Sequence, residues 1–230
     1  TVAYKSGFNN ITNNEWIWGS RQIDDHNTFF YSYFAYISAN FNSTVLRTQP
    51  RAINAMLWEQ IPITDVRKRM WDRTGANVPI PPGGARVPYQ NNKFLASSSS
   101  SSVGDVPYMR SAEMYLIEAE ARARQGQSGP AREALFTLVK ARNPNYVLST
   151  NSGQALIDEI MFNRRIELWG EGFRFTDLKR TTSPLNRNSI TNHLAALIMV
   201  YDIPADDVRW EWLFPQDEIN ANKAVEQNPL

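Results

Sequence analysis

The chain contains no cysteine and only two histidines. The absence of cysteine excludes a disulfide scaffold, Cys-ligated zinc, an iron–sulfur cluster and a thiol nucleophile. His26 and His193 lie far apart in the sequence, so no HExxH or His-x-His metal motif exists. Metal and thiol chemistry of these kinds is therefore excluded, and we expect no cofactor and no metal ligand set.

The chain also has no excess of either charge and no long apolar run. It carries 24 Lys and Arg against 23 Asp and Glu, a net charge of +1, which argues against nucleic acid as the main partner. No apolar run approaches the roughly 20 residues of a membrane-spanning helix. The chain begins at Thr1 without a signal-peptide pattern, so we expect its natural N-terminus to have been removed.

What the chain does have is a folding composition rich in aromatic residues. Its 230 residues are 42% hydrophobic and 12% aromatic, enough for one large domain or two small ones. Glu15–Ser20, which follows the turn-forming pair Asn13-Asn14, reads as a strand in which Trp16 and Trp18 share a face. Residues 26–36 hold six aromatics in eleven positions and show no clear period.

The remainder of the first 105 residues reads as short elements and loops. We predict short helices over 50–60 and 63–71, each with matching start or stop signals. Residues 87–95 look like a hairpin that turns at Asn91-Asn92, and the six serines before Asp105 read as a loop.

From Val106 onward the pattern becomes helical. Apolar residues recur at helical spacing from Tyr108, and a tight turn at Gly126 leads into a second helix, so that 107–140 forms a helical hairpin. Its 34 residues match the length of a tetratricopeptide repeat. A third helix is expected over 153–169 and a short one over 216–222. The chain thus reads as one region, 1–230, with an aromatic ligand-binding segment over residues 1–105, a hairpin over 106–143, and a helix and tail over 152–230.

The clusters of charged residues favour structure over catalysis. On the first long helix Glu113, Glu118 and Glu120 are expected to form a solvated face paired with nearby arginines. The dense charges of 164–180, interleaved with aromatics, are expected to form an ion-pair network that locks the third helix in place. No convergent pair of carboxylates and no Gly-x-Ser-x-Gly elbow can be named, so we do not expect an enzyme.

The aromatic stretch near the start is the candidate binding site. Sugar rings stack on Trp and Tyr through their apolar faces, and their hydroxyls pair with Asn, Asp, Gln and Arg. The candidate glycan-binding residues are Trp16, Trp18, Asp24, His26, Tyr31 and Tyr33. The competing interpretation is that these aromatics belong to the core.

Three stretches together resemble one family. They are 108–121 (YMRSAEMYLIEAEA), 163–180 (NRRIELWGEGFRFTDLKR) and 213–222 (LFPQDEINAN), the last followed by Gln227-Asn228-Pro229. In order and spacing they are similar to the C-terminal signature blocks of the SusD/RagB family of outer-membrane nutrient-binding lipoproteins of Bacteroidetes. The chain departs from the pattern at Asn163, at Phe173 and in a shortened Phe214-Pro215. It is also about half as long as family members and lacks their lipidated cysteine.

The resemblance implies a fold and a role. The fold would be mainly α, an incomplete SusD-like helical-repeat (tetratricopeptide-like) scaffold with long loops and small β elements. The role would be non-catalytic binding of oligosaccharide or polysaccharide at the cell surface and its delivery to a TonB-dependent, SusC-like transporter. The full-length protein would be held in the outer membrane by a lipid anchor that this chain lacks. Two alternatives stay open: peptide capture in the RagB manner, and a protein–protein docking subunit of the transporter complex.

Overall fold

The computed structural model describes the whole chain except residues 1–3, 5, 27–30, 193–195, 197 and 230. It divides into two compact units, unit 1 (1–171) and unit 2 (172–230). This boundary falls inside the segment 152–230 that the sequence analysis treats as one piece. The division of the chain into 1–105, 106–143 and 152–230 stays a prediction.

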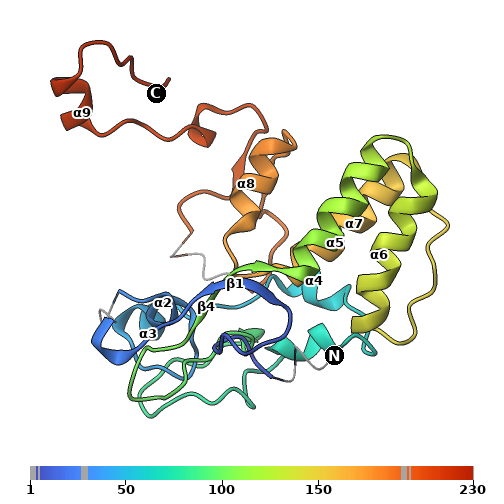
Figure 1. Cartoon of the computed structure of the whole chain (residues 1–230). Coiled ribbons are helices and arrows are strands. Elements are labelled where there is room, and N and C mark those ends of the chain that lie inside the picture. The colour runs from blue at the N-terminus through green and yellow to red at the C-terminus, as the bar shows by residue number, and fades with distance from the viewer. Residues whose placement is uncertain (1–3, 5, 27–30, 193–195, 197, 230) are drawn as a thin grey trace. The chain divides into compact units, whose positions relative to one another are not determined.

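Three long helices form one layer of unit 1. They are α5 (Ser111–Arg124), α6 (Ser128–Arg142) and α7 (Gly153–Glu167), and they lie side by side (Figure 1). Alanines and branched aliphatic residues fill the contacts between them, so the helices approach closely. The buried ones include Leu116, Ala119, Ala123, Ala131, Leu135, Leu138, Leu156 and Ile160. The predicted helical hairpin and third helix are confirmed, as is a mainly α fold.

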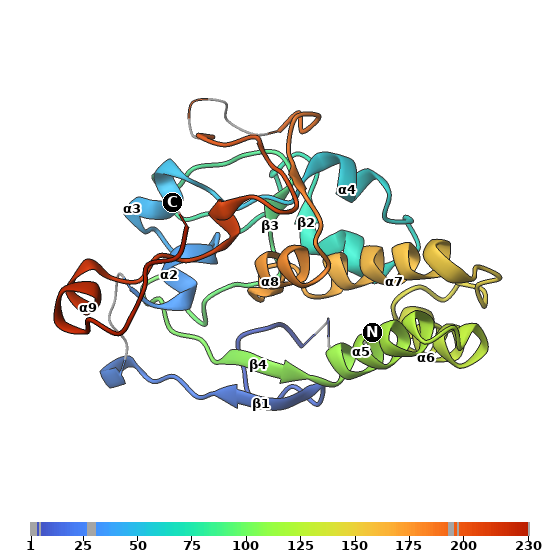
Figure 2. The ribbon, with the colours of Figure 1, turned by 90° about the horizontal axis from the view of Figure 1, so that it is seen from above.

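The first long helix begins later than its apolar spacing predicts. Val106–Arg110 is a strand, β4, that pairs in antiparallel fashion with β1 (Trp16–Ser20), and these two strands lie alongside each other in Figure 2. The predicted helical start at Tyr108 is therefore wrong. Pairing with a strand about 90 positions away determines that this segment is extended. The spacing of nearby residues does not reveal that pairing.

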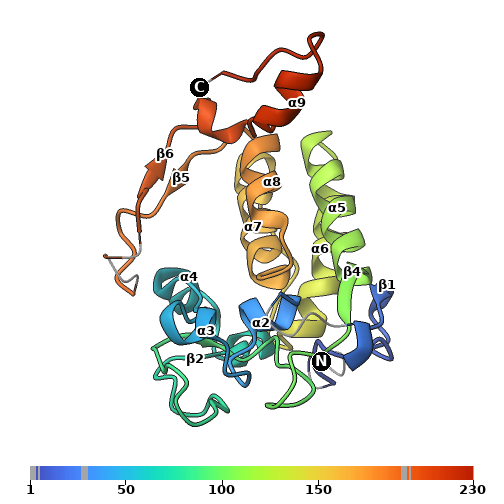
Figure 3. The same cartoon turned by 90° about the vertical axis from the view of Figure 1, so that its left-hand side faces the viewer.

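Below the helices, unit 1 is a layer of short elements joined by long loops (Figure 3). Helices of five residues are unstable alone, and side-chain caps support these: Ser32, Ser43, Asn54 and Asp65 each accept a hydrogen bond from a backbone N–H of the element that follows. The elements are η1 (Asp24–His26), α2 (Tyr33–Ile37), α3 (Thr44–Thr48), α4 (Ala55–Glu59), η2 (Val66–Met70), β2 (Trp71–Asp72) and β3 (Gln90–Asn91).

Two predictions for this layer need correction. The helix expected over 63–71 is the short 3₁₀ helix η2, and the helix expected over 50–60 is reduced to α4. The hairpin expected over 87–95 is wrong, because β3 pairs with β2 instead. The buried Asn91 side chain accepts from the N–H groups of Lys93 and Phe94 and donates to the carbonyl of Ile37, so it anchors the loop and does not turn a hairpin.

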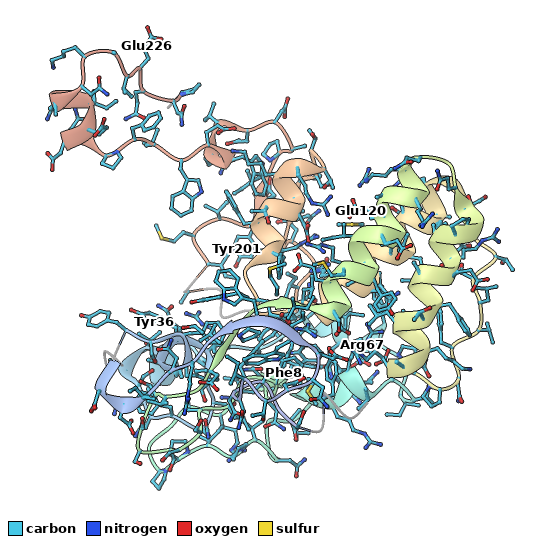
Figure 4. The ribbon with its side chains drawn as sticks, viewed as in Figure 1. Phe8, Tyr36, Arg67, Glu120, Tyr201 and Glu226 are labelled. Carbon is cyan, nitrogen blue, oxygen red and sulfur yellow. The ribbon has the colours of Figure 1, made fainter. Side chains whose placement is uncertain are left out.

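The core of the lower layer is largely aromatic. One cluster contains Tyr4, Phe8, Phe34, Ala35, Phe41, Phe94 and Ala96, and a second contains Ile53, Leu57, Ile61, Trp71 and Ile166. Phe8, labelled in Figure 4, lies within the dense packing of this layer. It meets the rings of Tyr4 and Phe94 edge to face at 5.1 and 5.5 Å. Much of the aromatic richness of the sequence is therefore core.

Unit 2 has few buried side chains. Leu178 and Trp210 are the buried hydrophobic residues among its described positions. Its elements are α8 (Phe173–Arg180), β5 (Leu185–Asn186), β6 (Asp202–Ile203), η4 (Val208–Trp210) and α9 (Gln216–Ala221). The α9 helix confirms the short helix expected over 216–222.

A buried network of charges joins the two layers of unit 1. Its centre is Glu167, the last residue of α7, which is fully buried. Its carboxylate accepts hydrogen bonds from Arg110 (3.1 Å), Arg142 (3.0 and 3.2 Å) and Arg67 (3.4 Å). These arginines come from the end of β4, the end of α6 and η2. One carboxylate therefore holds three segments that lie far apart in the sequence.

Further carboxylates and a lysine complete the network. Glu15 pairs with Arg110 and Arg142, and Asp65 with Arg67. Glu171 accepts from Arg110 and from Lys93, each at 2.7 Å. Four carboxylates thus meet four cations, which is the condition under which buried charges are tolerated.

Lys93 also closes the end of α7. Its ammonium group donates to the carbonyls of Glu167 (2.8 Å) and Trp169 (3.0 Å). The carbonyl of Glu167, the last residue of α7, lacks a partner within the helix, and a cation there also suits the helix dipole. The expected ion-pair network of 164–180 is present at Glu167 and Glu171, although its cations come from outside that block.

We predict that Glu167→Gln destabilises the protein by about 3–5 kcal/mol, because three buried arginines would lose their shared anion. Chemical denaturation would measure this loss. The matched control is Glu118→Gln on α5, which removes an exposed pair with Arg122 and should change the free energy of unfolding by less than about 1 kcal/mol. Equal losses in the two variants would contradict a central role for Glu167.

We also predict acid sensitivity from the same network. Burial alone would raise the pKa of Glu167, but Arg142, Arg110 and Arg67 more than offset this and hold the pKa well below its usual value of 4.5. A carboxyl whose pKa is lower in the folded state stabilises fully above its unfolded pKa and loses that effect as the pH falls. The free energy of unfolding should therefore drop as the pH falls below about 4.5, and Glu167→Gln should make that drop shallower. An identical slope in both proteins would contradict the prediction.

Candidate functional site

The ribbon formed by β1 and β4 is irregular. Its register pairs Trp16 with Arg110, Trp18 with Met109, and Gly19 with Pro107. One residue on each strand, Ile17 on β1 and Tyr108 on β4, is thereby left without an opposite partner. These are β-bulges, which change the direction in which neighbouring side chains point.

The bulges bring four large side chains to the surface of one ribbon. Ile17 and Trp18 are 57% and 61% exposed, and Tyr108 and Met109 are 50% and 38% exposed. Regular strands would alternate inward and outward residues, so consecutive exposed residues on both strands depend on the bulges. We call Ile17, Trp18, Tyr108 and Met109 the β1–β4 platform.

Two aromatic rings define the centre of this platform. The rings of Trp18 and Tyr108 lie 5.1 Å apart between centroids, at an interplanar angle of 63°. Each ring therefore supports the other while keeping much of its surface open. Exposed Trp and Tyr faces held in this manner suit ligands with flat apolar surfaces and polar edges, such as sugar rings.

Trp16 takes a different position from Trp18. It is half-buried, and its indole N–H is buried without a hydrogen-bond partner among the described residues. Its ring lies against Gly19, where an added Cβ would come within 2.9 Å of both the ring and the carbonyl oxygen of Val106. The expectation that Trp16 and Trp18 share a face is wrong, because the bulge at Ile17 lies between them. Trp16 supports the ribbon from within.

The other candidates lie elsewhere in unit 1. Asp24 is exposed in η1 and accepts a hydrogen bond from the Ser101 hydroxyl at 2.8 Å, which ties η1 to the serine loop. Tyr31 is 74% exposed. His26 lies in η1, but its side chain lies outside the described region of the structure. The ring contact of Trp18 is with Tyr108 and with none of these described candidates.

Tyr33 is a packing residue of the aromatic core. Its ring meets Phe34 and Phe94 edge to face at 5.2 and 5.4 Å, and its hydroxyl donates to the carbonyl of Gly170 at 3.0 Å. Burial, together with the nearby charge of Glu171, raises the pKa of Tyr33 well above its usual value. The contacts of Tyr33 therefore favour the interpretation that it belongs to the core over the interpretation that it binds a ligand.

Tyr108 and Met109 were not identified from the sequence. Tyr108 fits the helical spacing of the residues that follow, which placed it on a helix face. The sequence around Tyr108 contains no pattern that predicts the bulge or the pairing with β1. Nothing in it identifies Trp18 as a neighbour. The contact therefore became visible only in the fold.

The described residues hold no group of three or more His, Cys, Asp or Glu side chains arranged to bind a metal ion. Their acidic cluster, Glu15, Glu167 and Glu171, is matched by arginines and a lysine. Across the same described positions, no helix combines the length and apolar character needed to cross a membrane.

Comparison with known proteins gives a consistent picture. A model of the SusD family matches residues 3–230. A SusD-like carbohydrate binding protein from Bacteroides vulgatus ATCC 8482 aligns with 96% of the chain at a TM-score of 0.75 and 26% identity. A SusD superfamily protein from Bacteroides thetaiotaomicron VPI-5482 aligns with 97% at a TM-score of 0.77 and 22% identity. Surface glycan-binding protein A from Bacteroides thetaiotaomicron aligns with 96% at 0.66 and 18% identity.

These alignments cover 50%, 50% and 53% of the three solved structures. The chain thus spans about half the length of the proteins it matches. The two alignments below 25% identity show a shared fold. A search of curated proteins found no match.

The position of Tyr33 generates a prediction about stability. Tyr33→Phe removes the hydrogen bond to Gly170 but keeps the ring, so we expect a loss of about 1 kcal/mol in the free energy of unfolding. Tyr31→Phe, at an exposed position, is the matched control and should leave stability within about 0.5 kcal/mol of wild type. Urea denaturation of both variants would check this, and an unchanged midpoint for Tyr33→Phe would contradict the assigned role.

Proposed function

The chain belongs to the SusD family, and from this premise we propose that it binds oligosaccharide or polysaccharide without catalysis. The bound glycan would be captured at the cell surface, where a lipid anchor on the full-length protein would hold it. A SusC-like TonB-dependent transporter would then receive the glycan. Two of its structural relatives, a carbohydrate binding protein and a surface glycan-binding protein, support the ligand class.

The observation that carries the proposal is the exposed pair of Trp18 and Tyr108. A sugar ring can lay its C–H face on the indole, where it replaces water at an apolar surface. Ile17 and Met109, the exposed neighbours of the pair along the two strands, add apolar area to it. Because the pair stands on a paired ribbon, little conformational entropy is lost on binding.

The ribbon is also held in place from below. Arg110, the last residue of β4, is almost fully buried and donates to Glu167 and Glu171. Tyr108 and Met109 therefore come immediately before a residue that the buried network fixes. A site supported in this manner is preorganised for its ligand.

The sequence candidates divide on this basis. We keep Trp18 as the main contact and add Tyr108 and Met109. Tyr31 and Asp24 remain candidates for ligand contacts outside the platform, and Trp16 and Tyr33 are assigned to support.

We predict that Trp18→Ala lowers the affinity for the preferred polysaccharide about tenfold, equivalent to about 1.4 kcal/mol. Retardation of the protein in native gels that contain starch, β-glucan, xylan or galactomannan would measure this. Tyr108→Ala should give a similar loss, because the two rings support each other. Casein-derived peptides serve as the alternative ligand.

Ile63→Ala is the matched control, since Ile63 is 80% exposed in unit 1 and lies outside the platform. Its affinity should equal that of wild type. Binding of peptides but of no polysaccharide would favour peptide capture. Binding of polysaccharide with full affinity in the Trp18 and Tyr108 variants would place the site elsewhere.

A further inference from the structure

Unit 2 carries an exposed tryptophan of its own. Trp212 is 76% exposed and follows the short helix η4. Exposed tryptophan is unusual, because its large apolar surface is normally buried at least in part. Its contacts within unit 2 therefore need an explanation.

A stack of aromatic rings holds it. Trp210 is buried, and its indole N–H donates to the carbonyl of Pro204 at 2.6 Å. Phe175 on α8 lies 5.6 Å from the ring of Trp210 and 6.1 Å from the ring of Trp212. Trp212 thus rests on Phe175, which in turn rests on a buried residue.

The backbone from Trp212 to Phe214 is fixed by two carboxamides near the C-terminus. Gln227 accepts from the N–H of Phe214 at 2.8 Å and donates to its carbonyl at 3.0 Å. Asn228 donates to the carbonyl of Trp212 at 2.6 Å. These bonds imitate strand pairing and limit the conformations open to the loop.

An ion pair lies beside the ring. Lys179 and Phe175 are four residues apart on α8 and so share one face of that helix. Lys179 pairs with Glu211 at 2.8 Å, and the side chains are 41% and 47% exposed. The same face of α8 therefore contacts Glu211 through its lysine and Trp212 through its phenylalanine. The residues that adjoin Trp212 in sequence and Phe175 on α8 therefore carry a carboxylate and an ammonium group, both partly exposed.

We propose that Trp212, with Lys179 and Glu211, forms a second carbohydrate contact site, and that the protein holds one polysaccharide chain at two separate aromatic sites. The indole stacks on a sugar ring, and the ion pair exchanges hydrogen bonds with its hydroxyls. This inference rests on the proposed function and narrows its ligand to polymers long enough to reach both sites.

The expected gain comes from linkage. Once one site holds a repeating polymer, the second binding step is intramolecular, and overall affinity can exceed that of either site by a factor of about 10²–10⁴. A polysaccharide presents many identical units along its length, so some pair of them can match the span between the two sites, provided that the polymer is long enough to engage both. An oligosaccharide that engages one site at a time gains nothing.

The experiment compares wild type with Trp18→Ala, Trp212→Ala and the double variant. Retardation in gels containing starch, β-glucan, xylan or galactomannan measures polymer affinity, and calorimetry with the matching trisaccharide measures the number of sites. Each single variant should lose roughly tenfold or more in polymer affinity. For the trisaccharide, each should bind half as many molecules as wild type at unchanged affinity. Met199→Ala, at a position 97% exposed in unit 2, is the control and should behave as wild type.

Footprinting of wild type keeps the proposal testable if Trp212→Ala does not fold. Saturating polysaccharide should protect both Trp18 and Trp212 from radical oxidation and leave Met199 unprotected. Protection of Trp18 alone, or full polymer affinity in folded Trp212→Ala, would overturn the second site and leave the proposed function standing. Protection of Trp212 before any glycan is added would show a protein contact there and would also overturn it. Wild type that no polysaccharide retards would overturn the proposed function and this inference together.

Discussion

The fold of unit 1 depends on one buried carboxylate at the end of one helix. Glu167 stands where α7 ends, and Arg67, Arg110 and Arg142 reach it from three different segments. A charge without water must be paired, and Glu167 finds its partners in these three arginines, each of which also contacts a second carboxylate. This pairing fixes the helical layer on the layer of short elements, whose helices are too short to persist alone.

The candidate site inherits its order from the same network. Arg110 ends β4, so the interaction that holds the layers together also holds the ribbon that carries Trp18 and Tyr108. The bulges then turn large side chains outward at a place where the backbone is secured. A surface of this kind combines exposed apolar area with a rigid base. The combination is uncommon in a small domain, because side chains usually become rigid by being buried.

Unit 2 also holds an exposed aromatic ring on a fixed backbone, but it does so with different contacts. It has little core, and Trp212 is supported by stacked rings and by carboxamides that pair with the backbone. Weak individual contacts with sugars become useful when a polymer engages more than one of them. The proposed pair of aromatic sites would therefore retain a polysaccharide more strongly than either site alone.

The sequence by itself determined the helical hairpin, the third long helix, the first strand, the family and the presence of an ion-pair block around Glu167 and Glu171. These features have local signals, because helical period, turn residues and contiguous motifs lie within a few positions of one another. Only the tertiary structure decided which cations meet Glu167, that Tyr33 packs in the core, and that Tyr108 stands beside Trp18. Such contacts join residues that are mostly far apart in the sequence, and a bulge shifts the strand period on which any inference from spacing depends.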